Sequence, residues 1–309
     1  MTNINKLRRV AILGNQKGFI ANHICASLRE KGAETFIVDP RTIALQTDKV
    51  PRSVDEQEDV FLCDKEDGFA VSRVGSIFLC SSELSDTGWD QEKIHPTHCL
   101  SNSLKLLKTL HHKPDINWVN CIQAHHLYQS PMGQLSLAQK LGAKFPKTIV
   151  SHDPREVLAF SQSVSYTAFM PLEDNAQMAI LSDDLMDYRR LDFALCHSPV
   201  KVQEYIVGSN IRTYVLGDRV YSAQIQSDMI DCSEDLEARI VPVNTPEHIH
   251  QLSKTICRQF AMQWTAIDWR VDRQGHYYFL QANPGPIFQQ FEQQTGYPVT
   301  EQLTELLVA

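Results

Sequence analysis

The chain has 309 residues, of which 43% are hydrophobic and 21% charged, and its formal net charge is −8. This length suits two or three packed units, and the composition is typical of globular proteins. Lysine and arginine do not cluster, which argues against nucleic acid as the main partner, because phosphate binding needs grouped cations. No run approaches the roughly 18 apolar residues of a membrane span, and no apolar segment follows the charged first nine residues, so neither a membrane span nor a signal peptide is predicted.

The first elements form a β-α-β unit. Residues 10–13 are an apolar run that ends at Gly14, residues 19–31 have helical periodicity and stop at Gly32, and residues 35–38 form the next strand. This order predicts a parallel α/β unit. The turn between residues 14 and 18 is not G-x-G-x-x-G, so it does not indicate a dinucleotide site.

The next segments are less regular. Residues 60–63 and 69–71 are interpreted as a small hairpin, residues 76–80 as a buried strand, residues 103–112 as a helix and residues 116–120 as a strand. The first domain is predicted to end near residue 120. Eight cysteines are scattered without a C-x-x-C pair, which predicts small buried side chains in a reducing cytoplasm rather than a disulfide scaffold.

A second unit follows, with a helix at 134–141, a strand at 145–150, a helix that starts within 151–156, a strand at 166–172 and its hairpin partner at 176–181. From residue 200 the strands lengthen. Residues 200–206, 211–215 and 220–225 alternate by two, residues 246–262 form an amphipathic helix, and a strand pair at 264–271 and 276–282 precedes a final helix at 299–307.

Several ordered motifs carry a resemblance over residues 118–307. They are Gln134-Leu135 with Pro146 and Thr148, Gln203-Glu204-Tyr205-Ile206, Asn210-Ile211-Arg212 with Gly217-Asp218-Arg219-Val220, Ile267-Asp268-Trp269-Arg270, and Leu280-Gln281-Ala282-Asn283-Pro284. Together they resemble the ATP-grasp superfamily, above all the microviridin-type (graspetide) peptide ligases, followed by the ribosomal-protein glutamate ligases and glutathione synthetases.

The resemblance implies an α/β (α+β) ATP-grasp fold with an N-terminal parallel α/β domain. The domain expected to precede the ATP-grasp unit spans residues 1–120, the small lobe residues 121–200 and the large lobe residues 201–309. The implied cofactors are ATP and Mg²⁺. The implied partners are a peptide or amino-acid substrate and a second subunit, either in a homodimer or as a partner ligase.

The implied site lies between the two lobes. ATP would lie beside Gln203, Glu204, Tyr205 and Ile206, with lysines of the small lobe on its phosphates. Mg²⁺ would take oxygen ligands from Asp268 and from positions 281 and 283, which share one face of a strand because they are two apart. Arg212 and Arg270 would stabilise charge that develops as a carboxylate accepts the γ-phosphate and the acyl phosphate is attacked by an amine or hydroxyl.

Three positions depart from this pattern in the same direction. Gln281 stands where the family has glutamate, and a neutral amide lacks the charge that a divalent cation favours. The lysine expected before Pro171-Leu172 falls on Met170, and the lysine expected before Gln134 falls near Pro131. Lys140, Lys144 or Lys147 could replace one of the lost lysines.

Two functions therefore stay open. One is a carboxylate–amine or carboxylate–hydroxyl ligase with an altered ATP site. The other is a pseudo-ligase that binds a peptide or partners an active ligase. Simpler roles also remain: Asp268 could pair with Arg270 on one strand face, Arg212 could be a solvated residue, His125 and His126 could be loop histidines, and residues 289–294 could be a solvated loop or a helix turn.

Overall fold

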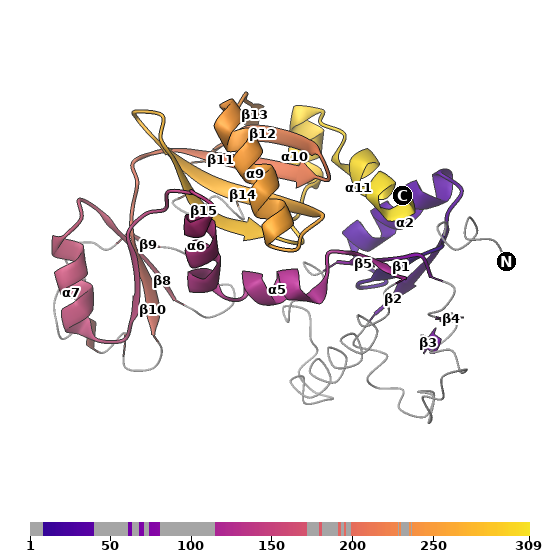
Figure 1. The fold of residues 1–309 in the computed structure, drawn as a ribbon, viewed down its shortest axis with the longest axis horizontal. Helices are drawn as coiled ribbons and strands as arrows, with labels where there is room; N and C mark the ends of the chain where they lie inside the picture. Colours follow the sequence, from indigo (N-terminus) through magenta and orange to yellow (C-terminus); the bar gives the residue numbers. More distant parts are fainter. Residues whose placement is uncertain are drawn as a thin grey trace.

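The structure is a computed structural model that describes residues 9–39, 61–63, 68–70, 74–80, 115–171, 179–180, 191–192, 195, 199–227, 229, 235 and 237–309. Figure 1 shows the sheets side by side along the long axis, with the N-terminal sheet at one end, the C-terminal sheet in the middle, and helix α7 (Pro154–Gln162) with its sheet at the other end. In the described ranges, none of the helices combines the length and the apolar character required to span a membrane. The helix predicted at 103–112 lies outside these ranges.

The N-terminal sheet is parallel, in the strand order β2-β1-β5-β6. Its strands are β1 (Arg9–Leu13), β2 (Glu34–Val38), β5 (Ser76–Leu79) and β6 (Asn117–Val119), and α2 (Phe19–Glu30) connects β1 to β2. All of these were predicted, the four strands from short apolar runs and α2 from its helical periodicity, and the pairings confirm the parallel α/β unit. The predicted hairpin is also confirmed, as β3 (Phe61–Cys63) paired with β4 (Gly68–Ala70).

The second sheet, called here the small-lobe sheet, is antiparallel and has the strand order β7-β10-β8-β9. Its strands are β7 (Thr148–Ser151), β8 (Thr167–Pro171), β9 (Ala179–Ile180) and β10 (Val200–Glu204). Helix α7 (Pro154–Gln162) begins after Asp153, whose carboxylate accepts a hydrogen bond from the Arg155 backbone N–H. Two helices precede this sheet, the unpredicted α5 (Ile122–Tyr128) and α6 (Pro131–Lys140), which starts earlier than expected.

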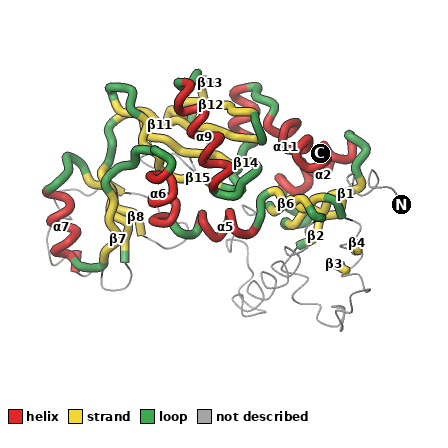
Figure 2. The backbone as a smooth tube through the Cα atoms, in the orientation of Figure 1, coloured by secondary structure: helices red, strands yellow, loops and turns green. Residues whose placement is uncertain are grey.

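The third sheet, called here the large-lobe sheet, has the strand order β13-β12-β11-β14-β15. Its strands are β11 (Gly208–Leu216), β12 (Arg219–Gln226), β13 (Arg239–Pro242), β14 (Trp264–Asp272) and β15 (Tyr277–Asn283). Helix α9 (Glu247–Gln259) lies across one face of this sheet, as Figures 1 and 2 show. The chain ends with α10 (Gln289–Thr295) and α11 (Val299–Val308). Strand β13 was not predicted, and residues 289–294 form a helix rather than a loop.

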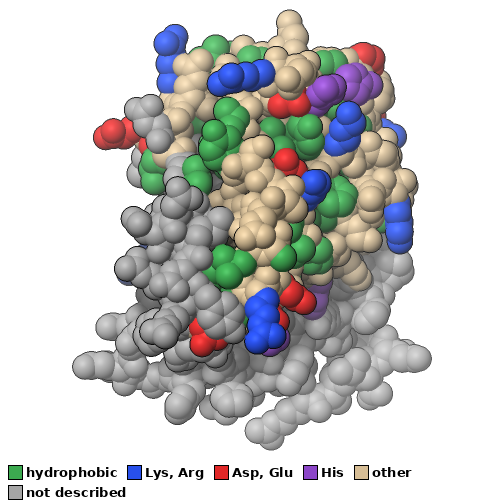
Figure 3. Space-filling model, turned by 90° about the vertical axis from the view of Figure 1, so that its left-hand side faces the viewer, with side chains coloured by type: hydrophobic (Ala, Val, Ile, Leu, Met, Phe, Trp, Pro, Cys, Tyr) green, Lys and Arg blue, Asp and Glu red, His purple; other side chains and the backbone are tan. Residues whose placement is uncertain are grey.

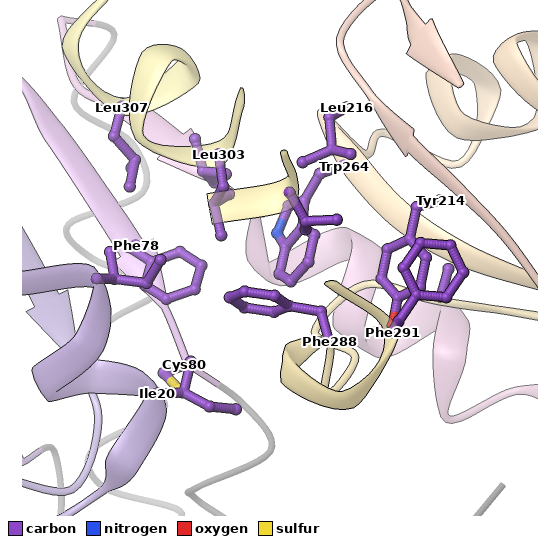
Figure 4. Close-up of a cluster of buried hydrophobic side chains, with 14 of the residues drawn as sticks. Ile20, Phe78, Cys80, Tyr214, Leu216, Trp264, Phe288, Phe291, Leu303 and Leu307 are labelled. Atoms are coloured by element: carbon purple, nitrogen blue, oxygen red, sulfur yellow. The ribbon is translucent and has the colours of Figure 1, made fainter. Parts of the chain in front are cut away.

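One hydrophobic core joins the N-terminal sheet to the large-lobe sheet. Figure 4 shows the rings of Phe78 of β5, Trp264 of β14 and Phe288 grouped together, with α11 supplying Leu303 and Leu307. The small-lobe sheet has a separate core, which includes Val157 of α7 together with Val200 and Val202. The first and last parts of the chain therefore share one core, while the small lobe packs around its own.

Candidate functional site

The face of the large-lobe sheet turned away from α9 is hydrophobic where it meets the N-terminal sheet, with Leu216 and Ala266 in that core, and polar beyond it. This second part is called here the polar face. Ile211, Ile267 and Phe279 share a hydrophobic cluster with residues of α9. Arg212 on β11 pairs with Asp268 on β14, and Asp268 pairs with Gln281 on β15. Because paired residues point to the same side and successive residues alternate, these three polar side chains lie on the face opposite α9.

These three side chains form a closed hydrogen-bonded cluster. The guanidinium of Arg212 donates from Nε to Asp268 Oδ1 at 2.7 Å and from Nη2 to Asp268 Oδ2 at 3.2 Å. Gln281 Nε2 also donates to Asp268 Oδ2, at 3.0 Å. The Arg212 and Asp268 side chains are only 17% and 16% exposed. The charge of the carboxylate is therefore balanced by one guanidinium, and both of its oxygens already accept hydrogen bonds.

Tyr214 lies on the same face of β11, two residues beyond Arg212. Its ring is fully buried and its hydroxyl donates to the Ile287 backbone oxygen at 2.8 Å. Burial raises the pKa of this phenol, while nearby Arg212 lowers it and Asp268 raises it. Tyr214 is consequently a neutral hydrogen-bond donor that holds the segment after β15 in place. Its position two residues after Arg212 in an alternating strand is the sequence signal that could have placed it on the same face as Arg212.

A β-bulge in β15 directs Gln281 to this face. Asp268 is paired with Gln281, but the next residue, Trp269, is paired with Phe279, so Leu280 has no partner on β14. Phe279 and Ala282 would point to opposite faces of a regular strand, yet both lie in the cluster against α9. The extra residue thus keeps Phe279 in the core and presents Gln281 on the polar face.

The end of β15 is held by two buried amides. The side-chain amide of Gln134 in α6 makes the two hydrogen bonds that a neighbouring strand would make to Ala282. Its Nε2 donates to the Ala282 oxygen at 3.3 Å, and its Oε1 accepts from the Ala282 N–H at 2.8 Å. Asn120 donates to the oxygens of Trp264 and Pro284 at 2.7 and 2.6 Å. Asn283 lies between these anchors, with its Oδ1 accepting from the Gly285 N–H at 2.9 Å. The positioning role of Asn120 was missed, because an amide after a strand gives no sequence signal.

Arg270 lies apart from the cluster and contacts the segment that follows β10. Its Nε donates to the Ile206 oxygen at 2.7 Å, its Nη2 to the Tyr205 hydroxyl at 2.7 Å and its Nη1 to Asn210 Oδ1 at 2.5 Å. Its guanidinium carbon also lies 4.8 Å from the centroid of the Tyr205 ring. The alternative pairing of Asp268 with Arg270 is therefore wrong, and Arg270 instead joins the two lobes.

The other predicted nucleotide-binding residues lie on the small-lobe sheet. Gln203 is buried and its Nε2 donates to Thr148 Oγ1 at 2.8 Å. Glu204 ends β10, and its carboxylate accepts from the Lys147 backbone N–H at 3.4 Å. Met170 lies in β8, directly opposite Lys201 of β10. Gln203, Glu204, Tyr205 and Ile206 thus form one continuous segment, which Arg270 connects to the large-lobe sheet.

Three further sequence features take simple positions. Pro131 is the first residue of α6, where its missing N–H costs no helical hydrogen bond. The lysines considered as replacements, Lys140, Lys144 and Lys147, are all exposed. His125 and His126 lie in α5 rather than in a loop. Within the residues that the structure describes, no three His, Cys, Asp or Glu side chains come together as a metal site.

Comparisons with known proteins match this architecture from end to end. The ATP-grasp ligase PsnB, solved with a minimal precursor, is 21% identical, with 97% of each chain covered and a TM-score of 0.82. The macrocyclase MdnC from Microcystis aeruginosa MRC, solved with the precursor peptide MdnA, is 18% identical, with 97% of this chain and 99% of MdnC covered and a TM-score of 0.80. A RimK domain ATP-grasp protein from Sphaerobacter thermophilus is 14% identical, with 97% of this chain and 100% of that chain covered and a TM-score of 0.63.

No family model matches the chain. No curated protein matches it either. The likeness to the solved structures nevertheless extends over the three larger sheets of the described residues and agrees with the ordered sequence motifs. The chain therefore has the ATP-grasp fold.

Proposed function

We propose that this protein is an ATP-grasp ligase that joins a carboxylate of a peptide or amino-acid substrate to an amine or hydroxyl, with an altered ATP site. The observation that carries the proposal is the pair formed by Arg212 and Asp268 on the polar face of the large-lobe sheet. It lies in an architecture shared with PsnB and MdnC, which were solved with precursor peptides. A peptide is accordingly the first substrate class to test.

In the proposed reaction, a substrate carboxylate attacks the terminal phosphate of ATP. An acyl phosphate forms and ADP leaves. An amine or hydroxyl then attacks the acyl carbon, and inorganic phosphate leaves. Arg212 would stabilise the negative charge that develops on the transferring phosphoryl group. A preorganised guanidinium stabilises the transition state, where this charge is largest, more than it stabilises the ground state.

Arg270 would act mainly by position. Its hydrogen bonds to Tyr205 and Ile206 hold the segment on which the adenine would lie. Gln203 and Glu204 precede that segment, so a base bound there would contact the end of β10. Met170, opposite Lys201, would offer the nucleotide an apolar contact and no charge.

Magnesium does not fit the residues as they are arranged. Asp268 supplies one carboxylate whose charge Arg212 already balances, and Gln281 presents its amide N–H₂ to that carboxylate. Asn283 Oδ1 accepts from Gly285. A hard divalent cation favours several free anionic oxygens, so no step of the proposed reaction is assigned to a metal here, although PsnB has been solved with Mg and ADP.

A pseudo-ligase is the second candidate, and the hydrogen bond from Gln281 to Asp268 favours it. A glutamate at position 281 could not donate this bond and would repel the aspartate in the absence of a cation. The glutamine instead completes a neutral cluster that is stable without metal. Such a protein would bind a peptide, as a homodimer or beside an active ligase, without consuming ATP.

Two measurements separate these functions. Calorimetry with ATP should detect binding in both cases, and mass spectrometry of a pooled library of peptides rich in Asp, Glu, Lys and Ser should detect loss of one water only for a ligase. Asp268→Asn should abolish that loss, whereas Asp218→Asn, at an exposed ion pair with Arg258, should leave it unchanged. ATP binding without any modified peptide or ADP would favour the pseudo-ligase, and no ATP binding at millimolar concentration would overturn the ligase proposal.

A further inference from the structure

A buried lysine lies in the middle of β10. Lys201 is only 7% exposed and is flanked in sequence by the core residues Val200 and Val202. Lysine is rarely buried to this degree unless an anion accompanies it, because removing an ammonium from water is costly. A lysine at this position therefore needs an explanation beyond filling the sheet.

The side chain of Lys201 points away from the core of the small lobe. Val200 and Val202 pack with Val157 of α7, so alternation along β10 directs Lys201 and Gln203 to the opposite face. Figure 1 places α7 on the outer side of this sheet and the large-lobe sheet on its other side. The outer side, seen in Figure 3, intersperses charged side chains of both signs with isolated hydrophobic ones and gathers no basic patch among the described residues.

Lys201 has no counter-charge in the described part of the chain. No ion pair or side-chain hydrogen bond joins it to another described residue. Its cross-strand neighbours are Val150 of β7 and Met170 of β8, and the nearby amide of Gln203 already donates to Thr148. Burial alone lowers the pKa of the Lys201 ammonium to about 8. An anion bound at this face would compensate the charge and raise that pKa.

The strand register indicates which anion this is. Lys201 and Met170 are paired, so their side chains leave the same face from neighbouring Cβ atoms. A lysine at either position reaches the same volume, beside the segment from Gln203 to Ile206 on which the nucleotide is proposed to lie. We propose that Lys201 binds the phosphates of that nucleotide and replaces, from the adjacent strand, the lysine that Met170 lacks. This inference rests on the proposed function, because it names a binding residue of the same nucleotide site.

The experiment is calorimetry with ATP, in EDTA and in magnesium, on four full-length proteins. These are the wild type, Lys201→Met, the exchanged pair Met170→Lys with Lys201→Met, and Lys17→Met at an exposed lysine outside the small lobe. We expect Lys201→Met to weaken ATP binding at least tenfold, the exchanged pair to recover most of it, and Lys17→Met to match the wild type. Thermal unfolding serves as the folding control, and Lys201→Met should not lower the melting temperature, because it removes an uncompensated buried charge.

A second readout does not depend on affinity. Acetylation of Lys201 by acetic anhydride, followed by mass spectrometry, should be slowed by ATP and unaffected by adenosine, which has no phosphate. If the wild type binds ATP and Lys201→Met binds it equally well, or if ATP leaves the acetylation rate unchanged, the role of Lys201 is wrong while the proposed function stands. If the wild type binds no ATP, the nucleotide site itself is overturned, and the role of Lys201 with it.

Discussion

At the scale of single residues, we expect Gln281 to determine how the cluster of Arg212, Asp268 and Gln281 responds to a metal ion. Its amide donates to Asp268 and leaves Arg212 as the only charge that balances this aspartate within the cluster. Gln281→Glu would place a second carboxylate beside Asp268 and would remove the donated hydrogen bond. We expect the variant to be less stable than the wild type by about 1–2 kcal/mol without metal, through like-charge repulsion and the lost bond.

Magnesium should reverse that loss. Two adjacent carboxylates with the Asn283 amide offer the oxygen ligands that Mg²⁺ prefers. Thermal unfolding should therefore show a rise in melting temperature with millimolar Mg²⁺ for Gln281→Glu and little change for the wild type. Gln274→Glu, in the exposed turn before β15, is the matched control. Equal responses of the wild type and Gln281→Glu to Mg²⁺ would contradict the account of the neutral cluster.

His125 of α5 predicts a dependence of stability on pH. Burial, and to a smaller extent the neighbouring His126, lowers the pKa of His125 to about 4, and its Nε2 has no hydrogen-bond partner among the described residues. The unfolded chain takes up a proton near pH 6.5, whereas the folded chain resists it until about pH 4. Between these values the unfolded state binds more protons, so stability falls as the pH falls, by up to about 3 kcal/mol.

Urea unfolding at pH 7 and pH 4.5 measures this effect. His125→Gln should flatten the difference between the two pH values. His126→Gln changes an exposed neighbour in the same helix and should keep most of the difference. A His125→Gln variant that loses as much stability in acid as the wild type would contradict the assignment.

At the scale of elements, Asn120 is the residue that joins most chain segments at the site. It donates to Trp264 and Pro284 and accepts from the backbone N–H groups of Gln263 and Trp264, so it ties the start of β14 to the end of β15. Asn120→Ala would leave these buried backbone groups without partners. The expected loss of folding stability is at least about 3 kcal/mol, because each buried group left unsatisfied costs roughly 1–3 kcal/mol.

Urea unfolding checks this value, with Gln274→Ala as a surface control that should change stability by less than about 0.5 kcal/mol. Asn120 is fully buried and only positions the strands. Asn120→Ala should therefore lose nucleotide binding only under conditions in which the variant unfolds. A loss below about 1 kcal/mol would mean that water replaces the amide and that Asn120 is not a structural anchor.

Most elements could be predicted because their signals are local. Apolar runs closed by Gly14, Gly32 and Gly142 marked the α/β units, and the two-residue alternation around Arg212 marked the long antiparallel strands. The bulge at Leu280 could not be predicted in this way, since a single extra residue in one strand is defined only by its partner. The correct prediction that residues 281 and 283 share a face held because the bulge precedes both.

The candidate site was predicted in part for the same reason. Asp268 and position 281 were expected together, and they are. Asp268 pairs with Arg212 rather than with Arg270 because of the register between β11 and β14. That register could not be predicted from the sequence. Lys201 escaped notice because a lysine in an alternating strand is usually a solvated residue, and only the folded structure shows that its side chain is buried.

At the scale of the whole molecule, Phe288 lies at the contact between the N-terminal sheet and the large-lobe sheet. It is fully buried, meets Trp264 edge-on and lies 6.4 Å from the His23 ring of α2. Phe288→Ala would open a cavity between these two parts. The expected cost is about 3–5 kcal/mol.

Calorimetric unfolding measures both that cost and the coupling between the sheets. Because the N-terminal sheet and the large-lobe sheet share one core, both should unfold in a single transition in the wild type and in the variant. The transition of the variant should occur at a lower temperature. Phe19→Ala, at a ring that is 67% exposed, should shift it little. A separate early transition for the N-terminal sheet would contradict the shared core.

The hydrogen bonds along the outer side of β15 also limit how a peptide can be recognised. Many peptide-binding proteins add their ligand to a sheet as one more strand, through the unpaired backbone of the last strand. Here that backbone is already occupied, since Gln134 bonds to both groups of Ala282 and the Lys144 oxygen accepts the N–H of Phe279. A peptide ligand cannot extend the large-lobe sheet at this position without displacing α6. Selection among peptides at this sheet should therefore depend on their side chains meeting its polar face, rather than on the backbone pairing that any extended sequence can offer.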